Sequence, residues 1–221
     1  MKLIHYRNIG YPKTGTNWLW LQLMNNKKVD ARFAINYKEY KGRNLEHYKK
    51  LYEKYNVSVN LNTHTFCELK NDDHFEHPNN IGNHTTHITF IFRNFYEVLN
   101  SMFNMEKNRD QQFRLSQNEF ITSRVPYYFD IEKIFNYWKS CNIKILFYDD
   151  LKKDPKQFYH DICDYIGIDP DYKSDIGIKF STNITEQLNF IDVDVIKYMN
   201  DNISKLEDLS KRNLSHWKKI I

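Results

Sequence analysis

The sequence predicts an α/β fold in which a central parallel sheet is flanked by helices, and three features support this. Short apolar runs alternate along the chain with longer stretches of helical periodicity. A glycine-containing turn joins the first apolar run to the first helical stretch. No repeat, low-complexity segment or linker interrupts the 221 residues, so we expect one domain over residues 1–221. Strands that alternate with helices pair in parallel, because each crossover helix returns the chain to the same end of the sheet.

Periodicity places the expected elements. Apolar runs without helical spacing predict strands at 3–9, 57–61, 88–92 and 143–148. Apolar residues spaced by three and four predict helices at 17–25, 44–55, 96–106, 131–140, 155–166 and 193–208. The helix at 155–166 has clear boundaries, since Asp154 can cap it, Pro155 suits its first position and Gly167 suits its end. Segment 107–124 is polar and weakly patterned, which is typical of a mobile lid or a surface loop.

The turn after the first predicted strand has the composition of an anion-binding loop. Residues 10–18 read G-Y-P-K-T-G-T-N-W and contain two of the chain's six glycines, Gly10 and Gly15. Backbone N–H groups in such a turn bind phosphate or sulfate together with the positive end of the helix dipole. The glycines have the P-loop separation, but Thr16-Asn17 stands where a P-loop kinase has its Lys-Ser or Lys-Thr pair. The missing pair counts against a nucleotide kinase, which remains one alternative; a non-catalytic nucleotide-binding module is another.

The motif P-K-T-G-T-x-W resembles the 5′-phosphosulfate loop of sulfotransferases, which use 3′-phosphoadenosine 5′-phosphosulfate (PAPS) as the donor. The resemblance implies a P-loop-NTPase-like three-layer fold. It also implies the transfer of a sulfuryl group to a hydroxyl or amine of a small-molecule or glycan acceptor, with no metal required. Lys13 would then be catalytic, because its charge stabilises the leaving phosphate. The implied donor ligands in this loop are Pro12, Lys13, Thr14, Gly15, Thr16, Asn17 and Trp18.

Later motifs extend the resemblance over most of the chain. Arg93-Asn94 with Ser101 resembles the family's 3′-phosphate signature, although Phe95 replaces the usual proline. The stretch from Val125 to Trp138 and from Ile143 to Pro155 resembles a family segment that places a tyrosine near the nucleotide. The stretch from Lys211 to Lys218 resembles a loop that closes over the 3′-phosphate, but it lacks the glycines and is one residue shorter. The implied nucleotide ligands are Arg93, Ser101, Tyr127, Lys211 and Arg212.

Two residues are candidates for the base that deprotonates the acceptor. His64 follows the predicted strand 57–61 in N-T-H, where cytosolic sulfotransferases have K-T-H with a catalytic histidine; Asn62 replaces the lysine. A histidine suits this role because its pKa lies near neutrality. Glu39 belongs to a Lys-Glu pair, and other sulfotransferases use the glutamate of such a pair as the base. Both residues remain candidates, with His64 preferred.

Composition and residue spacing bear on three further questions: nucleic-acid binding, metal binding and cellular compartment. A net charge of +4 is too weak to indicate nucleic-acid binding. Paired histidines (His74, His77, His84 and His87) with Cys67 nearby have spacings found in zinc sites, but the polar loop between the pairs favours no metal. The chain shows no stretch near the roughly 18 apolar residues of a membrane span, and strand 3–9 leaves no room for a signal peptide. Together with three cysteines in no recognisable pairing, this predicts a cytoplasmic protein of undetermined oligomeric state.

Overall fold

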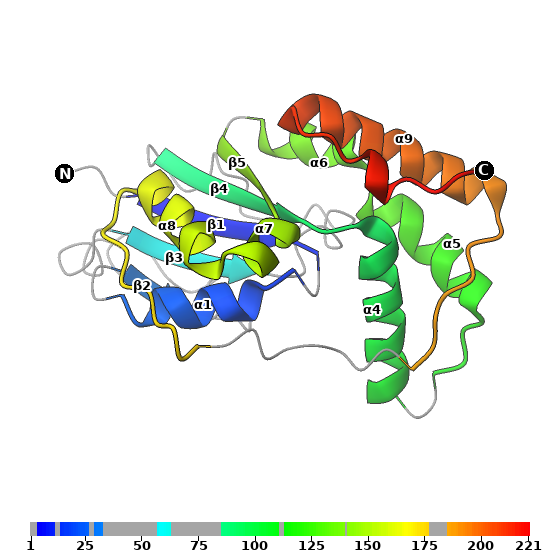
Figure 1. The fold of residues 1–221 in the computed structure, drawn as a ribbon, viewed down its shortest axis with the longest axis horizontal. Helices are drawn as coiled ribbons and strands as arrows, with labels where there is room; N and C mark the ends of the chain where they lie inside the picture. The colour runs from blue at the N-terminus through cyan, green and yellow to red at the C-terminus, as the bar shows by residue number, and fades with distance from the viewer. Residues whose placement is uncertain are drawn as a thin grey trace, which may run out of the picture. The chain divides into compact units, whose positions relative to one another are not determined.

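The computed structural model describes residues 4–11, 14–26, 29–32, 57–62, 85–110, 113–139, 141–176 and 185–221. The chain forms two compact units (Figure 1). The sheet unit comprises Met1–Phe92 and Trp138–Phe180, and the helical unit comprises Arg93–Tyr137 and Ser181–Ile221. The expectation that residues 1–221 form one domain stays a prediction.

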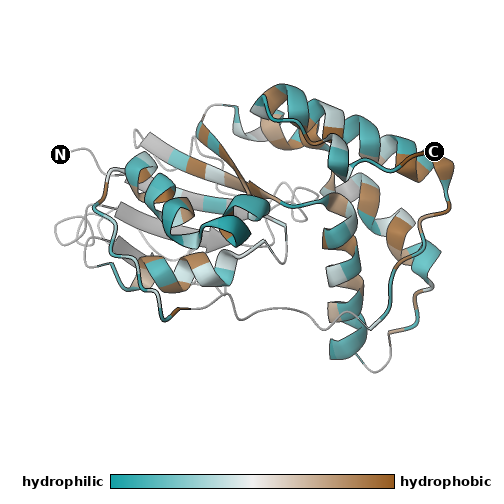
Figure 2. Ribbon diagram, in the orientation of Figure 1, coloured by the Kyte–Doolittle hydropathy of each residue, from teal (hydrophilic) through white to brown (hydrophobic). Residues whose placement is uncertain are grey.

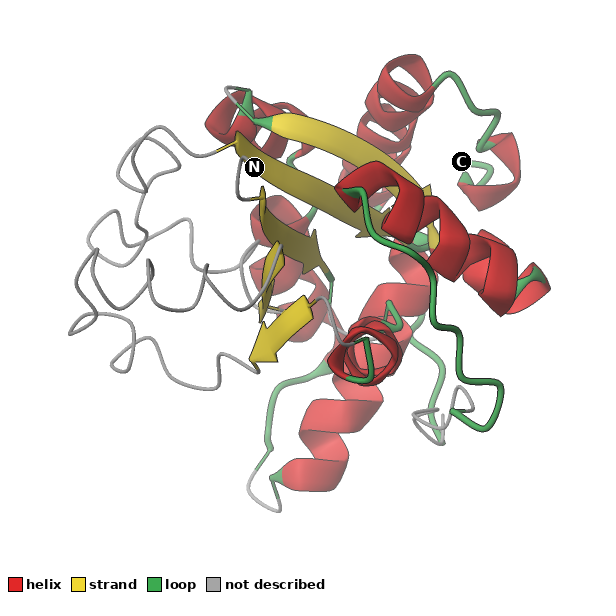
Figure 3. Cartoon of the chain, turned by 90° about the vertical axis from the view of Figure 1, so that its left-hand side faces the viewer, coloured by secondary structure: helices red, strands yellow, loops and turns green. Residues whose placement is uncertain are grey.

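The sheet unit contains a five-stranded, fully parallel sheet, whose strands are drawn in yellow in Figure 3. Its strands are β1 (Ile4–Gly10), β2 (Val29–Arg32), β3 (Val57–Asn62), β4 (Thr85–Phe92) and β5 (Asn142–Phe147). They lie in the order β2-β3-β1-β4-β5. This confirms the predicted α/β fold with a parallel sheet. The short strand β2 was not predicted, because four residues carry little periodic signal.

Three helices of this unit share one hydrophobic core with the sheet: α1 (Thr16–Met24), α7 (Tyr148–Lys153) and α8 (Pro155–Ile166). Tyr6 of β1, Ile91 of β4 and Leu146 of β5 contribute to this core from the strands. Helix α8 has the predicted boundaries, and its Asp154 cap accepts a hydrogen bond from the Gln157 amide. Helix α7 was not predicted, since the sequence pattern of β5 continues into its first residue.

One side of α1 holds the segment that leaves this unit. The Trp18 indole N–H donates to the Ile176 carbonyl at 3.0 Å. The Gln22 amide donates to the carbonyl of Lys173 and accepts from its N–H, both at 2.9 Å. Asn26 donates to the Asp169 carbonyl at 2.8 Å. Trp18 and Gln22 are four residues apart and therefore lie on one side of α1, and Asn26 follows the end of the helix, so the segment lies along that side.

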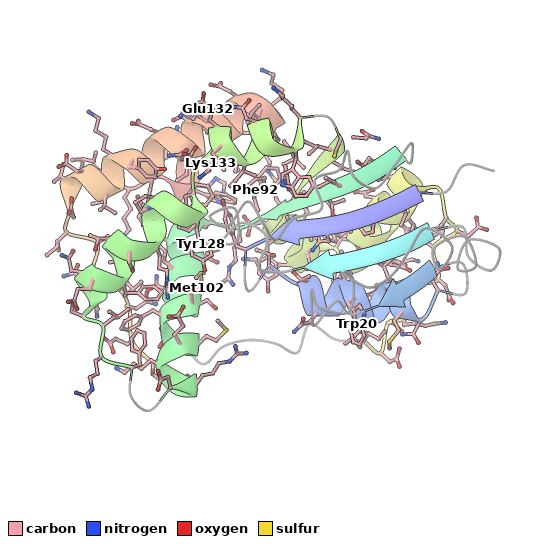
Figure 4. The ribbon with its side chains drawn as sticks, turned by 180° about the vertical axis from the view of Figure 1, so that it is seen from behind. Trp20, Phe92, Met102, Tyr128, Glu132 and Lys133 are labelled. Atoms are coloured by element: carbon pink, nitrogen blue, oxygen red, sulfur yellow. The ribbon has the colours of Figure 1, made fainter. Side chains whose placement is uncertain are left out.

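The helical unit contains α4 (Phe95–Arg109), α5 (Gln117–Tyr128), α6 (Ile131–Trp138), α9 (Val193–Ser210) and the 3-10 turn η4 (Ser215–Trp217). Hydrophobic and hydrophilic residues alternate along α9, as a surface helix requires (Figure 2). Met102 of α4 and Tyr128 of α5, both labelled in Figure 4, are buried. The Ile131 N–H of α6 donates a hydrogen bond to the Asn202 side-chain oxygen of α9 at 3.1 Å, and this bond joins the two helices.

The structure contradicts the interpretation of 107–124 as a lid or surface loop. Helix α4 continues to Arg109, and α5 begins at Gln117 behind a capping box formed by Ser116 and Glu119. Phe120 is fully buried and packs edge-on against Phe103 and Phe113. The S-x-x-E pattern at 116–119 was the sequence signal for this helix start.

The predicted helix 44–55 lies outside the described residues. Within the described part of the chain, no helix combines the length and the apolar character that crossing a membrane requires.

Candidate functional site

The sheet topology singles out one end of β1. β1 lies between β3 and β4, and the strand order reverses there. In open parallel sheets, ligands bind outside the carboxyl ends of the strands at such a reversal. Gly10 at the end of β1 is in register with Ile91 near the end of β4. The predicted anion loop follows β1 directly, and Arg93 follows the last residue of β4, so both motifs begin at carboxyl ends of adjacent strands.

A buried polar link joins β1 to β4 below this end of the sheet. The Thr89 hydroxyl donates to the Asn8 side-chain oxygen at 2.9 Å, and lies 2.6 Å from the Tyr6 hydroxyl. All three side chains are fully buried. Burial also raises the pKa of Tyr6, so its hydroxyl stays protonated at any physiological pH. The link holds in place the strand that carries the loop.

The conformation of the loop depends on Gly15. The Thr14 hydroxyl donates to the Tyr11 carbonyl at 2.8 Å, and this bond closes the turn before the helix. Gly15 is the N-cap of α1 and has φ +83°, in the left-handed region that favours glycine. A Cβ atom at this position would lie 2.4 Å from Cδ2 of Leu151 in α7. Glycine is therefore required both by the backbone conformation and by the close approach of α7.

The N-terminus of α1 has the features of an anion site. Gly15 has no side chain that could cap the helix, so the first N–H groups of α1 receive no side-chain cap. The Thr16 hydroxyl is buried and has no hydrogen-bond partner among the described residues. Uncapped amides, the helix dipole and an unsatisfied hydroxyl together suit a phosphate or sulfate group.

Two further loop residues differ in their surroundings. The Asn17 side chain is exposed. Trp18 is 1% exposed, and its ring centroid lies 6.2 Å from that of Phe158. Because its indole N–H bonds the Ile176 carbonyl, Trp18 holds the segment after α8 against α1. Hydrogen bonding of the indole to a ligand is therefore not the role that this geometry supports.

In the helical unit, Arg93 stands at the start of α4. Its side chain is 15% exposed, and its Nε donates to the Glu97 carboxylate at 2.9 Å. Asn94 caps the helix by accepting a hydrogen bond from the Tyr96 amide at 3.0 Å. Glu97 was not identified from the sequence, although its spacing of four residues from Arg93 was the available signal. The pair orients one edge of the guanidinium.

The other predicted phosphate ligands of this unit lie on α4 and after α9. Ser101 is buried on α4, two turns beyond the helix start. Lys211 is the C-cap of α9 and has φ +55°, while Arg212 begins the final segment. The red C-terminal residues run back along α9 in Figure 1. Each of these residues lies in the helical unit together with Arg93.

A family model for the sulfotransferase domain matches residues 8–219. The chain belongs to the sulfotransferase family. Three solved structures show that this sulfotransferase shares its fold with distant members. The enzyme from Alicyclobacillus acidocaldarius is 16% identical, with a TM-score of 0.59 and coverage of 97% of this chain and 98% of that one. The sulfotransferase domain of the Synechococcus PCC 7002 olefin synthase is 12% identical, with a TM-score of 0.56 and 97% of each chain covered.

A mouse sulfotransferase complexed with PAP is 18% identical to this sulfotransferase, with a TM-score of 0.52 and coverage of 98% of this chain and 86% of that one. No curated protein sequence is significantly similar to the chain. The family and the structural neighbours confirm the P-loop-like α/β fold that the motifs implied.

Several predicted site residues of this sulfotransferase fall outside the described residues: Pro12, Lys13, Glu39 and His64. Tyr127 lies in the last turn of α5, and the structure describes its backbone alone. Of the histidines considered for a metal, His87 is described; it lies on β4, where its ring packs edge-on against Tyr165. Among the described residues, no cluster of three or more potential metal ligands occurs.

Proposed function

We propose that this sulfotransferase moves a sulfuryl group from PAPS to a hydroxyl or amine of a small-molecule or glycan acceptor. The observation that carries the proposal is the α1 N-terminus, where a glycine cap leaves the first amides uncapped and the buried Thr16 hydroxyl lacks a partner among the described residues. A tetrahedral anion with several acceptor oxygens suits this donor set.

The roles of the loop residues follow from the negative charge that the leaving phosphate gains during transfer. The donor supplies an activated sulfuryl group with a phosphate as its leaving group. The N–H groups of residues 14–17 and the Thr16 hydroxyl bind the phosphosulfate and orient it for in-line attack. Lys13 stabilises the charge that the leaving phosphate gains, and a fixed cation is most effective where charge develops. Thr14 and Gly15 act on the shape of the loop, because their contacts are with Tyr11 and Leu151.

The 3′-phosphate of the donor is assigned to the helical unit. Arg93 has one guanidinium edge fixed by Glu97, and a guanidinium can bind a phosphate with two parallel N–H groups. Ser101 adds a hydroxyl, and Lys211 and Arg212 add positive charge. Tyr127 is proposed to lie near the nucleotide.

We expect the protein to bind 3′-phosphoadenosine 5′-phosphate far more tightly than ADP or AMP, and Arg93→Ala to remove most of that preference. Losing one charged hydrogen-bond partner costs about 1.5–3 kcal/mol. Calorimetry with both diphosphates measures the effect. Arg124→Ala is the matched control, because Arg124 belongs to the same unit and pairs with Glu106 at 3.1 Å. Equal affinity of the wild type for the two diphosphates would contradict the proposed donor.

The base is tested by a pair of variants. If His64 deprotonates the acceptor, His64→Ala should lower turnover by roughly 10²-fold or more, while Glu39→Gln should have a small effect. If Glu39 is the base, the order reverses, and the acidic limb of the pH profile should lie below the ordinary pKa of a histidine. Turnover measured from pH 4 to 9 in both variants decides between them. A small effect in both would remove both residues from the chemical step.

The reaction class is tested with labelled PAPS and a panel of phenolic, alcoholic, amine and glycan acceptors. Transfer of label that persists in EDTA supports the proposal. Turnover of ATP that depends on Mg²⁺, without use of PAPS, would instead indicate a kinase. Tight nucleotide binding without transfer to any acceptor would indicate a binding module.

A further inference from the structure

The residue that replaces the family's proline connects two parts of the helical unit. Phe95 is fully buried at the start of α4, directly after Arg93-Asn94. Its ring stacks on Phe129 with centroids 4.5 Å apart, and lies 6.1 Å from the ring of Trp217 in η4. Trp217 is 2% exposed. The C-terminal segment is therefore packed against the helix start that carries Arg93.

The carboxylate of Glu207 binds the C-terminal segment at two points. Glu207, in the last turns of α9, accepts a hydrogen bond from the Leu214 amide at 2.6 Å and from the Lys218 ammonium at 2.5 Å. These side chains are partly buried, with 21% of Glu207 and 30% of Lys218 exposed. The hydrogen bond from Lys218 lowers the pKa of Glu207, so the carboxylate is ionised at neutral pH. We refer to residues 211–219 as the C-terminal loop.

Further contacts hold the last residue of the C-terminal loop and stabilise its turn. The Asn200 side chain bonds both the N–H and the carbonyl of Lys219, at 3.1 and 2.8 Å. Within the loop, the Trp217 amide donates to the Leu214 carbonyl at 2.8 Å. At its beginning, Lys211 has φ +55° without being a glycine. A loop bound at this many points has already lost much of the conformational freedom that ligand binding would otherwise remove.

We propose that Phe95 and Glu207 are positioning residues that hold the C-terminal loop pre-formed, so that Lys211 and Arg212 meet the 3′-phosphate of the donor without a closing motion. The inference rests on the proposed function. Phe95 fixes the loop to the helix start behind Arg93 through Trp217, and Glu207 fixes the loop to α9. The two contacts anchor different points of the loop, so removing either one should loosen the loop at that point.

The first test compares affinities for 3′-phosphoadenosine 5′-phosphate and ADP in Phe95→Leu and Glu207→Gln. We expect the affinity for the 3′-phosphorylated nucleotide to fall roughly tenfold in each variant, while the affinity for ADP stays unchanged, because ordering of the loop is then required on binding. Two controls separate positioning from stability. Phe113→Leu removes a ring that packs edge-on against Phe103 and Phe120 in the same unit, and Glu132→Gln removes the exposed ion pair with Lys205. Both controls should retain the wild-type ratio.

The second test follows tryptic cleavage after Lys211 and Arg212. The wild-type loop should be cleaved slowly with or without 3′-phosphoadenosine 5′-phosphate, whereas Glu207→Gln should be cleaved rapidly unless the nucleotide is present. The inference is overturned if both variants keep the wild-type affinity ratio and protease resistance, or if the controls lose the ratio equally. Failure of the proposed donor is seen separately, because wild type itself would then bind both nucleotides equally.

Discussion

Replacing Lys13 with alanine should lower the turnover of sulfuryl transfer by roughly 10²–10³, the usual effect of removing one electrostatic stabiliser of developing charge. Binding of the desulfated nucleotide should weaken much less, since the lysine's contribution is greatest when the leaving phosphate gains charge. Single-turnover rates and calorimetry on the same preparation measure the two effects. Because the desulfated nucleotide already carries the leaving phosphate as a free group, its affinity reports ground-state binding to the loop.

The control for this variant is Lys205→Ala, which removes an exposed lysine from α9 and should leave turnover unchanged. A Lys13→Ala protein that retains normal turnover would exclude this residue from the chemical step. Equal losses of turnover and of nucleotide affinity would assign Lys13 to binding instead.

Gly15→Ala should destabilise the protein more than the same substitution at Gly167. The added Cβ would lie 2.4 Å from the Leu151 side chain, and φ +83° is unfavourable for alanine. We expect a loss of free energy of unfolding on the order of 3 kcal/mol, since overpacking typically costs about 1–3 and a left-handed conformation about 1–2. Nucleotide binding should weaken as well, because the first turn of α1 must move.

Gly167→Ala is the matched control for this steric argument. Gly167 ends α8 with φ +69°, but nothing lies within 4 Å of the position that its Cβ would take. Its cost should therefore be that of the backbone conformation alone, roughly 1–2 kcal/mol. Urea unfolding of the two variants isolates the contact with Leu151. Equal destabilisation by both would show that α7 yields to the added methyl group.

Local patterns predicted the elements that depend on neighbours in sequence. Helix α8 was predicted to the residue, because Asp154, Pro155 and Gly167 delimit it by short-range hydrogen bonding and backbone preference. Residues 10–18 were predicted to form an anion site for the same reason, since a glycine turn before a helix has its properties from a few consecutive residues. Helix α5 was not predicted, although Ser116 and Glu119 carried a local signal, because the apolar residues of segment 107–124 are only weakly periodic.

The sequence alone therefore predicted the family and the parallel α/β fold, both of which are confirmed, since these follow from short patterns in their order along the chain; the anion loop stays a prediction. Contacts between distant residues were decided by the folded chain. The order β2-β3-β1-β4-β5 places the ends of β1 and β4 side by side, and Gly15 is confined by Leu151 from α7. Phe95, read from the sequence as a departure from a motif, packs against Trp217 more than a hundred residues later. Such pairings depend on which surfaces burial brings together, and no local pattern encodes them.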